Sequence, residues 1–345
     1  MSITQLSSSG APNPTETVLV TGGSGFVASH VVRELLQQGY SVRVTVRSEA
    51  IAKKVLQAHD GQRLSYILVP DMIVPGAYDA AVQGITGVFH LSSPFTFTTT
   101  DNANDLLIPA ISGTQGILQS IKQHGPDVKR VVLTSSVAAM VDPSVGFDRG
   151  HLYTENDWPK TTWDEAVKGS AFVGYAASKQ FAEKAAWEFM ENEKPSFDLV
   201  TIYPPIIIGP IIMPTQGLRT NPSLAYVYEL MNAKLDAPGE TPFPAWVDFR
   251  DTAKAHVRAY QEAIASNQRY ATSSGTFSMQ QLVDIMRKHF PLLEGRLPTG
   301  RTEESEVIGV DSSKVIRDLG FAPRGLEETV VDTVNSFLEI EKTGY

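Results

Sequence analysis

The chain has 345 residues, of which 42% are hydrophobic and 19% are charged, and it contains no cysteine. This length allows one large α/β domain with a lobe, or two domains. The absence of cysteine excludes disulfides, thiolate metal sites and cysteine nucleophiles. A net charge of −9 argues against a nucleic-acid partner.

No apolar run approaches the roughly 20 residues that cross a bilayer, and no signal peptide is evident. We therefore expect a cytoplasmic protein without a membrane partner, either a monomer or a homodimer. The seven histidines show no ligand-like spacing with carboxylates, so we expect no metal site.

Short β-branched runs alternate with helical stretches through the first half of the chain. This alternation predicts right-handed crossovers and a parallel sheet with helices on both faces. The expected strands cover residues 18–21, 42–46, 64–69, 88–91, 131–134 and 199–202, and the expected helices 28–38 and 171–192.

The pattern becomes irregular and rich in proline after Gly209. We expect a smaller, mostly helical lobe here, covering the carboxyl edge of the sheet. The predicted division is a flexible tail at 1–15, a main domain at 16–208 and a lobe at 209–345, segments of which return to the main domain. The expected helices of the lobe cover residues 223–232, 251–265 (with Asp251 as N-cap candidate), 279–289, 312–318 and 327–341.

A glycine-rich turn joins the first expected strand to the helix that follows it. Gly22 permits a tight turn, Gly25 lets the backbone approach a pyrophosphate, and the small Ala28 lets the helix pack closely on the strand. The helix N-terminus adds unpaired N–H groups. Glycines also mark plain turns, but the flanking strand and helix favour a dinucleotide site. The predicted fold class is α/β, a Rossmann-type doubly wound parallel sheet with a mostly helical C-terminal substrate lobe.

Arg47 follows the second strand, where NAD sites usually carry an acidic residue. A guanidinium can hold the 2′-phosphate of NADP through two hydrogen bonds. Lys53 or Lys54 could add positive charge, although the spacing from Arg47 is longer than usual, and the acidic Glu49 nearby is a mild argument against a phosphate site. The alternative is that Arg47 merely faces solvent, but its position after this strand favours NADPH.

Two segments that follow strands offer further cofactor contacts. Asp71 could accept a hydrogen bond from the adenine amino group, with Met72 packed on the ring, and a role for Asp71 as a helix N-cap is nearly as well supported. Leu91 and Ser92, at the end of the fourth strand, are also expected to contact the cofactor.

Tyr175 and Lys179 lie four residues apart on an expected helix, so they share one face. The ammonium is expected to lower the tyrosine pKa from about 10, as a general acid near neutral pH requires. Such a pair is common by chance, but a strand ending in Ser135 and Ser136 adds hydroxyls at the carboxyl edge of the sheet, where ligands bind. We expect Ser136 to polarise a substrate carbonyl, with Ser135 as its competitor.

In combination these motifs resemble those of extended short-chain dehydrogenases/reductases, in particular fungal NADPH-dependent aldehyde and methylglyoxal (3-methylbutanal) reductases, relatives of dihydroflavonol 4-reductase. The resemblance implies hydride transfer from NADPH to an aldehyde or ketone, with Ser136, Tyr175 and Lys179 as catalytic triad and Tyr175 as proton donor. It rests on residues 21–30, 46–48, 71–72, 133–136, 175–187, 204–210 and 247–256. The cofactor contacts that it implies are Gly22, Gly23, Ser24, Gly25, Phe26, Val27, Arg47, Asp71, Met72, Pro204, Ile207 and Ser223.

The chain departs from this superfamily in two places. An Asn that often supports a proton relay on the helix after the fourth strand has no clear counterpart in residues 112–117. Tyr203 stands where Asn often precedes the first proline. The proton relay is therefore in doubt.

Phe95 and Phe97 follow the fourth strand and are placed to line a substrate pocket near the nicotinamide. Its other walls are expected to include Val137, Met140, Tyr203 and residues between Ile211 and Tyr226, although each of these side chains could equally belong to the core. An apolar pocket with few polar groups suits a hydrophobic carbonyl substrate. His90 ends a strand, but we interpret it as a packed side chain because Tyr175 already supplies the proton.

Two other functions fit parts of this pattern. One is a nucleotide-sugar epimerase or dehydratase of the same superfamily, which would need a diphosphate site in the second lobe. The other is a non-catalytic NADP sensor, which would be expected to lose the pair formed by Tyr175 and Lys179.

Overall fold

The computed structural model describes residues 16–59, 63–93, 98–142, 151–213, 221–232, 235–241, 243–302 and 309–343. A seven-stranded sheet forms the centre of the main domain, in the order β3-β2-β1-β4-β5-β6-β9, with every neighbouring pair parallel. Its strands are β1 (Thr17–Thr21), β2 (Ser41–Val46), β3 (Leu64–Leu68), β4 (Gly87–His90), β5 (Arg130–Thr134), β6 (Asp198–Tyr203) and β9 (Arg269–Ala271).

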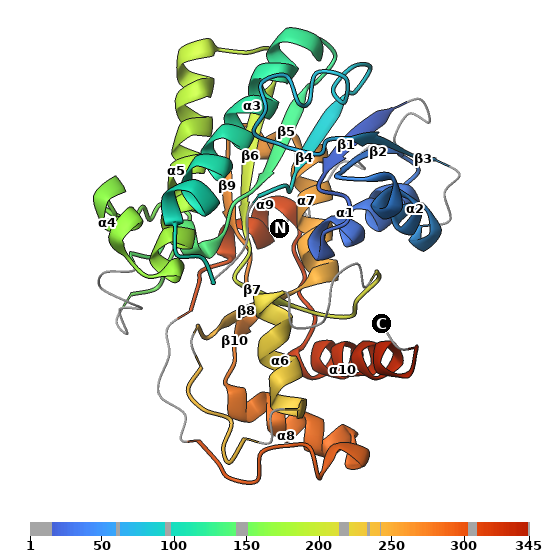
Figure 1. Cartoon of the computed structure of the whole chain (residues 1–345), viewed down its shortest axis with the longest axis vertical. Helices are drawn as coiled ribbons and strands as arrows, with labels where there is room; N and C mark the ends of the chain where they lie inside the picture. Colours follow the sequence, from blue (N-terminus) through green and yellow to red (C-terminus); the bar gives the residue numbers. More distant parts are fainter. Residues whose placement is uncertain are drawn as a thin grey trace, which may run out of the picture.

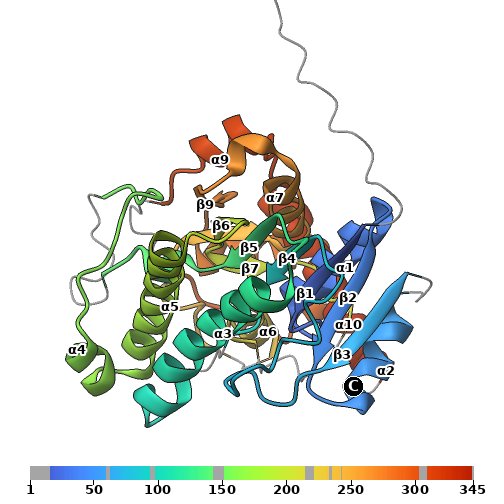
Figure 2. The same cartoon turned by 90° about the horizontal axis from the view of Figure 1, so that it is seen from above.

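Helices cover both faces of this sheet, with α3 and α5 on one side and α7 and α9 on the other (Figure 2). Successive β1 side chains alternate between the two hydrophobic cores: Val18 and Val20 pack with α1, α7 and α9, and Leu19 packs with α3 and α5. The predicted Rossmann-type parallel fold is therefore confirmed. The helices are α1 (Phe26–Gln37), α2 (Glu49–Ala58), α3 (Ile108–His124), α5 (Ala171–Glu193), α7 (Phe249–Gln261) and α9 (Ser313–Leu319).

The second lobe, seen below the main sheet in Figure 1, combines helices with a small sheet. Strand β8 (Ala245–Asp248) lies in the middle of this sheet, parallel to β7 (Ile206–Ile208) and antiparallel to β10 (Gly275–Thr276). The sheet was not predicted, because strands of two to four residues are too short to show a period of two. The helices here are α6 (Pro222–Asn232), α8 (Met279–His289) and α10 (Leu326–Thr343).

Short elements connect these layers. They are the π-helix η1 (Ala103–Leu107), the 3-10 helices η2 (Val137–Ala139), η3 (Ala263–Ala265) and η4 (Pro291–Leu293), and the helix α4 (Trp163–Lys168). Within the described residues, no helix is long and apolar enough to span a membrane.

The N-terminus of α7 differs from the prediction. Asp248, not Asp251, is the N-cap, and its Oδ1 accepts a hydrogen bond of 2.7 Å from the Arg250 N–H. Asp251 instead forms an ion pair with Arg324 and accepts a hydrogen bond of 2.7 Å from the Arg324 backbone N–H.

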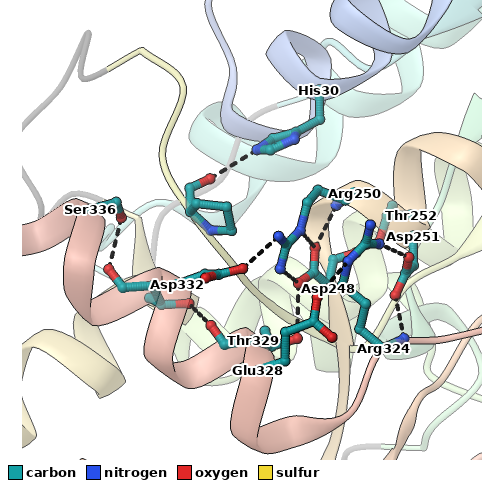
Figure 3. Close-up of polar contacts among 12 residues, drawn as sticks. His30, Asp248, Arg250, Asp251, Thr252, Arg324, Glu328, Thr329, Asp332 and Ser336 are labelled. Carbon is teal, nitrogen blue, oxygen red and sulfur yellow. Dashed lines mark hydrogen bonds and ion pairs between the residues drawn. The ribbon is translucent and has the colours of Figure 1, made fainter. Parts of the chain in front are cut away.

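A polar cluster joins α10 to the start of α7 (Figure 3). The fully buried Asp248 receives hydrogen bonds from Arg250 at 2.7 Å and from the Thr329 hydroxyl at 2.9 Å, and Arg250 also pairs with Asp332 at 2.6 Å. Burial alone would raise the pKa of Asp248, but Arg250 holds it below its ordinary value. Nearby, His30 of α1 donates a hydrogen bond of 2.9 Å to the Pro210 carbonyl, which fixes the chain between β7 and the lobe.

Replacing Arg250 with methionine should destabilise the fold by about 3 to 5 kcal/mol, because the buried Asp248 carboxylate then loses its cation. The free energy of unfolding in urea measures this change. Lys168→Met is the control, since the ion pair of Lys168 with Asp164 is 76% and 79% exposed and should contribute almost nothing. Equal effects of the two substitutions would contradict the structural role of Asp248 and Arg250.

Candidate active site

Ser136 and Tyr175, from different elements, meet in the wall of one cavity of about 540 Å³. Ser136 follows β5 and caps η2, where its hydroxyl accepts a hydrogen bond of 3.2 Å from the Ala138 N–H. Tyr175 lies in the first turns of α5, a helix capped by Ser170, and its phenol forms a hydrogen bond with the Ser136 hydroxyl. Two hydroxyl groups therefore point at one spot in this cavity.

Lys179 lies one turn further along α5. Its Nζ is 5.9 Å from the centre of the Tyr175 ring, and burial lowers its pKa to about 8. Among the described residues, the ammonium has no hydrogen-bond acceptor and no ion-pair partner. The three members of the expected triad therefore lie in one neighbourhood.

The pKa of Tyr175 differs from the expectation that Lys179 would lower it. Burial raises the pKa of the phenol to about 12, and the hydrogen bond with Ser136 offsets only part of this change. An apolar site penalises the phenolate more than the neutral phenol. Tyr175 thus holds its proton firmly at neutral pH.

Ser135 and Ser136 have separate roles, although the sequence left them as competitors. The Ser135 hydroxyl is buried and donates a hydrogen bond of 2.8 Å to Oε2 of Glu183, on α5. Ser136 lines the cavity, and Ser135 does not. Only Ser136 can contact a molecule bound there.

Tyr203, expected in the pocket wall, lies in the protein core instead. Its side chain is 0% exposed, its hydroxyl forms a hydrogen bond with Glu183, and the Arg269 guanidinium stacks 4.7 Å from its ring centre. A buried carboxylate must be hydrogen-bonded, and Tyr203 supplies one of these hydrogen bonds from within the core, while it is not among the residues that line the cavity. The substrate-binding role predicted for Tyr203 is therefore wrong.

The cavity is lined mostly by apolar side chains from the two lobes. Val137, which was expected in the pocket wall, lines the cavity. Ser223, which was expected to contact the cofactor, lines it as well. Phe95 and Phe97 lie outside the described residues. No charged side chain lies among the described lining residues. Pro222 and Tyr226 come from the expected range 211–226, whereas Met140 is not among the lining residues. The lining residues that the sequence analysis did not expect are Ala138, Val141, Ser170, Ala171, Phe172, Ala176, Pro205, Ile206 and Phe243.

Two glycines of the turn between β1 and α1 have no room for a side chain. Gly22 has a φ of +66°, and a Cβ there would lie 2.9 Å from the Ser92 Oγ. A Cβ on Gly23 would lie 2.6 Å from the Val44 Cβ. Gly25 is the N-cap of α1 and provides no side-chain hydrogen bond to the first-turn N–H groups, so this backbone cradle fits a dinucleotide pyrophosphate.

Arg47 and Lys53 are exposed beyond the end of β2. Glu49, whose negative charge argues against a phosphate site here, accepts a hydrogen bond of 2.7 Å from the Tyr66 hydroxyl. Arg47 has no ion pair among the described residues, so its guanidinium can bind an anion at this edge of the sheet.

The other expected cofactor residues lie along the same edge or at the cavity. Asp71 accepts a hydrogen bond of 3.0 Å from the Ile73 N–H in a turn that begins no helix, so the alternative helix-cap role is wrong. Met72 packs against Gly113 of α3, where a Cβ would lie 2.2 Å from the Met72 Cε. Of the remaining expected residues, Ser24, Phe26 and Val27 lie at the start of α1, Leu91 and Ser92 follow β4, Pro204 precedes β7, and Ile207 is within β7.

Among the described residues, no group of three or more histidine, cysteine or acidic side chains could hold a metal ion.

Residues 18–271 match the NAD dependent epimerase/dehydratase family. The chain is 42% identical over 335 residues to ketoreductase azaE of Aspergillus niger, covering 93% of this chain and 97% of that protein. It is 37% identical over 339 residues to NADPH-dependent methylglyoxal reductase GRE2 of Saccharomyces cerevisiae, covering 94% and 99%. It is also similar to the crystal structure of yeast methylglyoxal/isovaleraldehyde reductase Gre2 complexed with NADPH, with a TM-score of 0.88 and 36% identity, covering 94% and 99%.

Substituting alanine for Gly23 should destabilise the protein by about 1 to 3 kcal/mol, because the new methyl group overlaps Val44. Gly295→Ala is the matched control, since Gly295 has nothing within 4 Å of its Cβ position. Urea unfolding without any ligand measures both variants. Equal stabilities of the two variants would show that the cradle has spare room.

Proposed function

Because this chain belongs to the NAD dependent epimerase/dehydratase family, we propose that it reduces aldehydes and ketones to alcohols with NADPH, with Tyr175 as the proton donor. The observation that carries the proposal is the hydrogen-bonded pair of Ser136 and Tyr175 in the wall of an apolar cavity. The similarity to ketoreductase azaE and to a methylglyoxal reductase supports it.

The residues present fit NADPH. The turn at Gly22, Gly23 and Gly25 would hold the pyrophosphate, and Arg47 would pair with the 2′-phosphate. Lys179 would bind the nicotinamide ribose through its ammonium, which has no acceptor among the described residues. When bound, NADPH supplies the hydride that reduces the carbonyl carbon.

The hydroxyls of Ser136 and Tyr175 would both donate hydrogen bonds to the carbonyl oxygen, which polarises the C=O bond. As negative charge develops on this oxygen, the Tyr175 phenol transfers its proton to it and the alcohol forms. Tyr175 carries its proton at neutral pH, and its transfer depends on groups that stabilise the phenolate. The phenolate left behind is stabilised by the Ser136 hydroxyl and the nearby Lys179 ammonium.

The cavity favours an uncharged, largely hydrophobic carbonyl substrate. Side chains such as Val137, Phe172, Ile206 and Phe243 form its walls, and a volume of about 540 Å³ lies within the range of small-molecule sites. A nucleotide-sugar substrate would need cations for its diphosphate, and no Lys or Arg is found among the described lining residues. A sensor that only binds NADP would not require the pair of Ser136 and Tyr175.

We also propose a cytoplasmic location, because a chain without cysteine gains no disulfide stabilisation from an oxidising compartment. A monomer or a homodimer remains the prediction for its assembly.

Replacing Tyr175 with phenylalanine should lower kcat with a hydrophobic aldehyde by at least about 100-fold, because the proton donor is lost. NADPH consumption at 340 nm measures turnover, and fluorescence titration measures the Kd for NADPH, which should change little. Phe172→Leu, which alters the cavity wall but no hydroxyl, is the control and should retain turnover. Turnover of the phenylalanine variant at the wild-type rate would rule out the proposed proton donor.

Replacing Arg47 with glutamate should shift the cofactor preference from NADPH toward NADH, because the carboxylate repels the 2′-phosphate and can accept from a ribose hydroxyl. The ratio of kcat/KM for the two cofactors measures this preference and should fall by about 100-fold or more, since a charge-assisted contact becomes a repulsion. Lys129→Glu is the control, because it reverses an exposed charge at the opposite edge of the sheet, before β5, and it should change the ratio much less. An unchanged ratio in the Arg47 variant would place the 2′-phosphate elsewhere.

A further inference from the structure

His90 is a buried histidine that the proposed mechanism does not use. It ends β4 at the carboxyl edge of the main sheet and is 1% exposed. In the sheet it lies opposite Thr21 of β1 on one side and Leu133 of β5 on the other. It therefore stands between the strand that leads into the glycine-rich turn and the strand that leads to Ser136.

The hydrogen bonds of Thr21 determine which nitrogen of His90 carries the proton. The Thr21 Oγ1 accepts hydrogen bonds of 3.0 Å from the backbone N–H groups of both Leu91 and Ser92. A hydroxyl has two acceptor sites and one proton. Both acceptor sites of Thr21 are used by the two N–H groups, so its hydroxyl donates its proton to the Nδ1 of His90, also 3.0 Å away. Nδ1 is then an acceptor, and the proton of the neutral ring must be on Nε2.

The neutral state of His90 agrees with its surroundings. Burial, with the positive charge of Lys179 as a smaller cause, lowers the pKa of His90 to about 3. The Tyr78 ring meets the imidazole edge-on, with 6.0 Å between the ring centres and an angle of 85°, which restricts rotation of the imidazole. His90 is thus a fixed, neutral N–H donor at physiological pH.

This donor has no acceptor. The Nε2 of His90 is buried and lacks a hydrogen-bond partner among the described residues, and a buried N–H group without a partner is costly. The ammonium of Lys179, whose charge acts on His90, also lacks an acceptor in the described part of the chain. Two groups that can only donate are thus left without acceptors among the described residues, and the hydroxyl oxygens of a bound molecule would supply acceptors for both.

We propose that His90 is a positioning residue for the cofactor: its Nε2–H and the Lys179 ammonium together donate hydrogen bonds to the hydroxyl oxygens of the nicotinamide ribose. This inference rests on the proposed binding of NADPH. Thr21 contributes indirectly, since it holds the tautomer that places the proton on Nε2. The ribose is thereby fixed from the β4 side as well as from α5, which sets the position of the nicotinamide relative to Ser136 and Tyr175.

Nitrogen-15 NMR of the histidine side chains in the full-length protein tests the tautomer and the contact. The His90 signals are assigned by their loss in the His90→Gln spectrum. We expect a neutral ring with the proton on Nε2 from pH 5 to pH 8, and a shift of the Nε2–H signal when NADP⁺ saturates the protein. A proton on Nδ1, or an Nε2–H signal that stays in place at saturation because this group only packs on Tyr78, would overturn the proposal.

Two variants distinguish the loss of the Nε2–H donor from the loss of the imidazole ring of His90. His90→Leu removes the N–H donor and should weaken NADPH binding about tenfold, the effect of one lost hydrogen bond, whereas His90→Gln keeps an N–H group and should bind within about threefold of the wild type. Fluorescence titration gives both Kd values, and thermal unfolding without cofactor verifies that each variant is folded. A folded leucine variant with wild-type affinity, or a glutamine variant as weak as the leucine variant, would refute the role of His90.

The wild-type protein distinguishes this inference from the proposed function. If it binds and consumes NADPH with an aldehyde while the Nε2–H signal of His90 does not shift and His90→Leu binds NADPH as the wild type does, only the inference about His90 fails. If the wild-type protein does not bind NADPH, the proposed function fails and the inference fails with it.

Discussion

The buried carboxylate of Glu183 decides which hydroxyl groups near the end of β5 can face the cavity. It accepts hydrogen bonds from Ser135 at 2.8 Å and from the Trp187 indole at 3.0 Å, and it also binds the Tyr203 hydroxyl. The guanidinium of Arg269 lies 3.0 Å away and compensates its charge. Because a buried carboxylate without such partners is costly, these groups are held in the core, and Ser136 and Tyr175 remain for the cavity.

The same helix links this core network to the site chemistry. Tyr175, Lys179 and Glu183 follow one another at intervals of four residues, so they lie along one face of α5. The hydrogen bonds of Glu183 with Ser135, just after β5, and with Tyr203 of β6 fix the rotation of the helix and with it the direction of the Tyr175 phenol. Burial then keeps the phenol protonated, because it raises the pKa of Tyr175 to about 12. The packing of α5 thus sets both the direction of the phenol and its pKa.

The main sheet and the proximity of Ser136, Tyr175 and Lys179 could be predicted because short motifs define them. The glycines at 22 and 25 fall between a strand and a helix, and Ser136 directly follows a buried strand, so the sequence places both at the ligand-binding edge. The role of Tyr203 could not be predicted, since its position after a strand does not reveal the carboxylate of Glu183 beside it. The predicted direction of the pKa shift of Tyr175 was also wrong, because the spacing along the helix reveals the nearby cation but not how deeply the phenol is buried. The sheet of β7, β8 and β10 and cavity residues such as Phe243 depend on contacts between distant segments.

Hydride transfer to a carbonyl carbon beside Ser136 and Tyr175 is tested most directly by following the hydrogen itself. The protein is supplied with NADPH that carries deuterium in both positions at C4 of the nicotinamide, together with a hydrophobic aldehyde, and the product is examined by mass spectrometry and proton NMR. The expected result is an alcohol with one deuterium on its carbinol carbon. An alcohol without deuterium at this carbon, or unchanged aldehyde with NADPH intact, would contradict the reductase function.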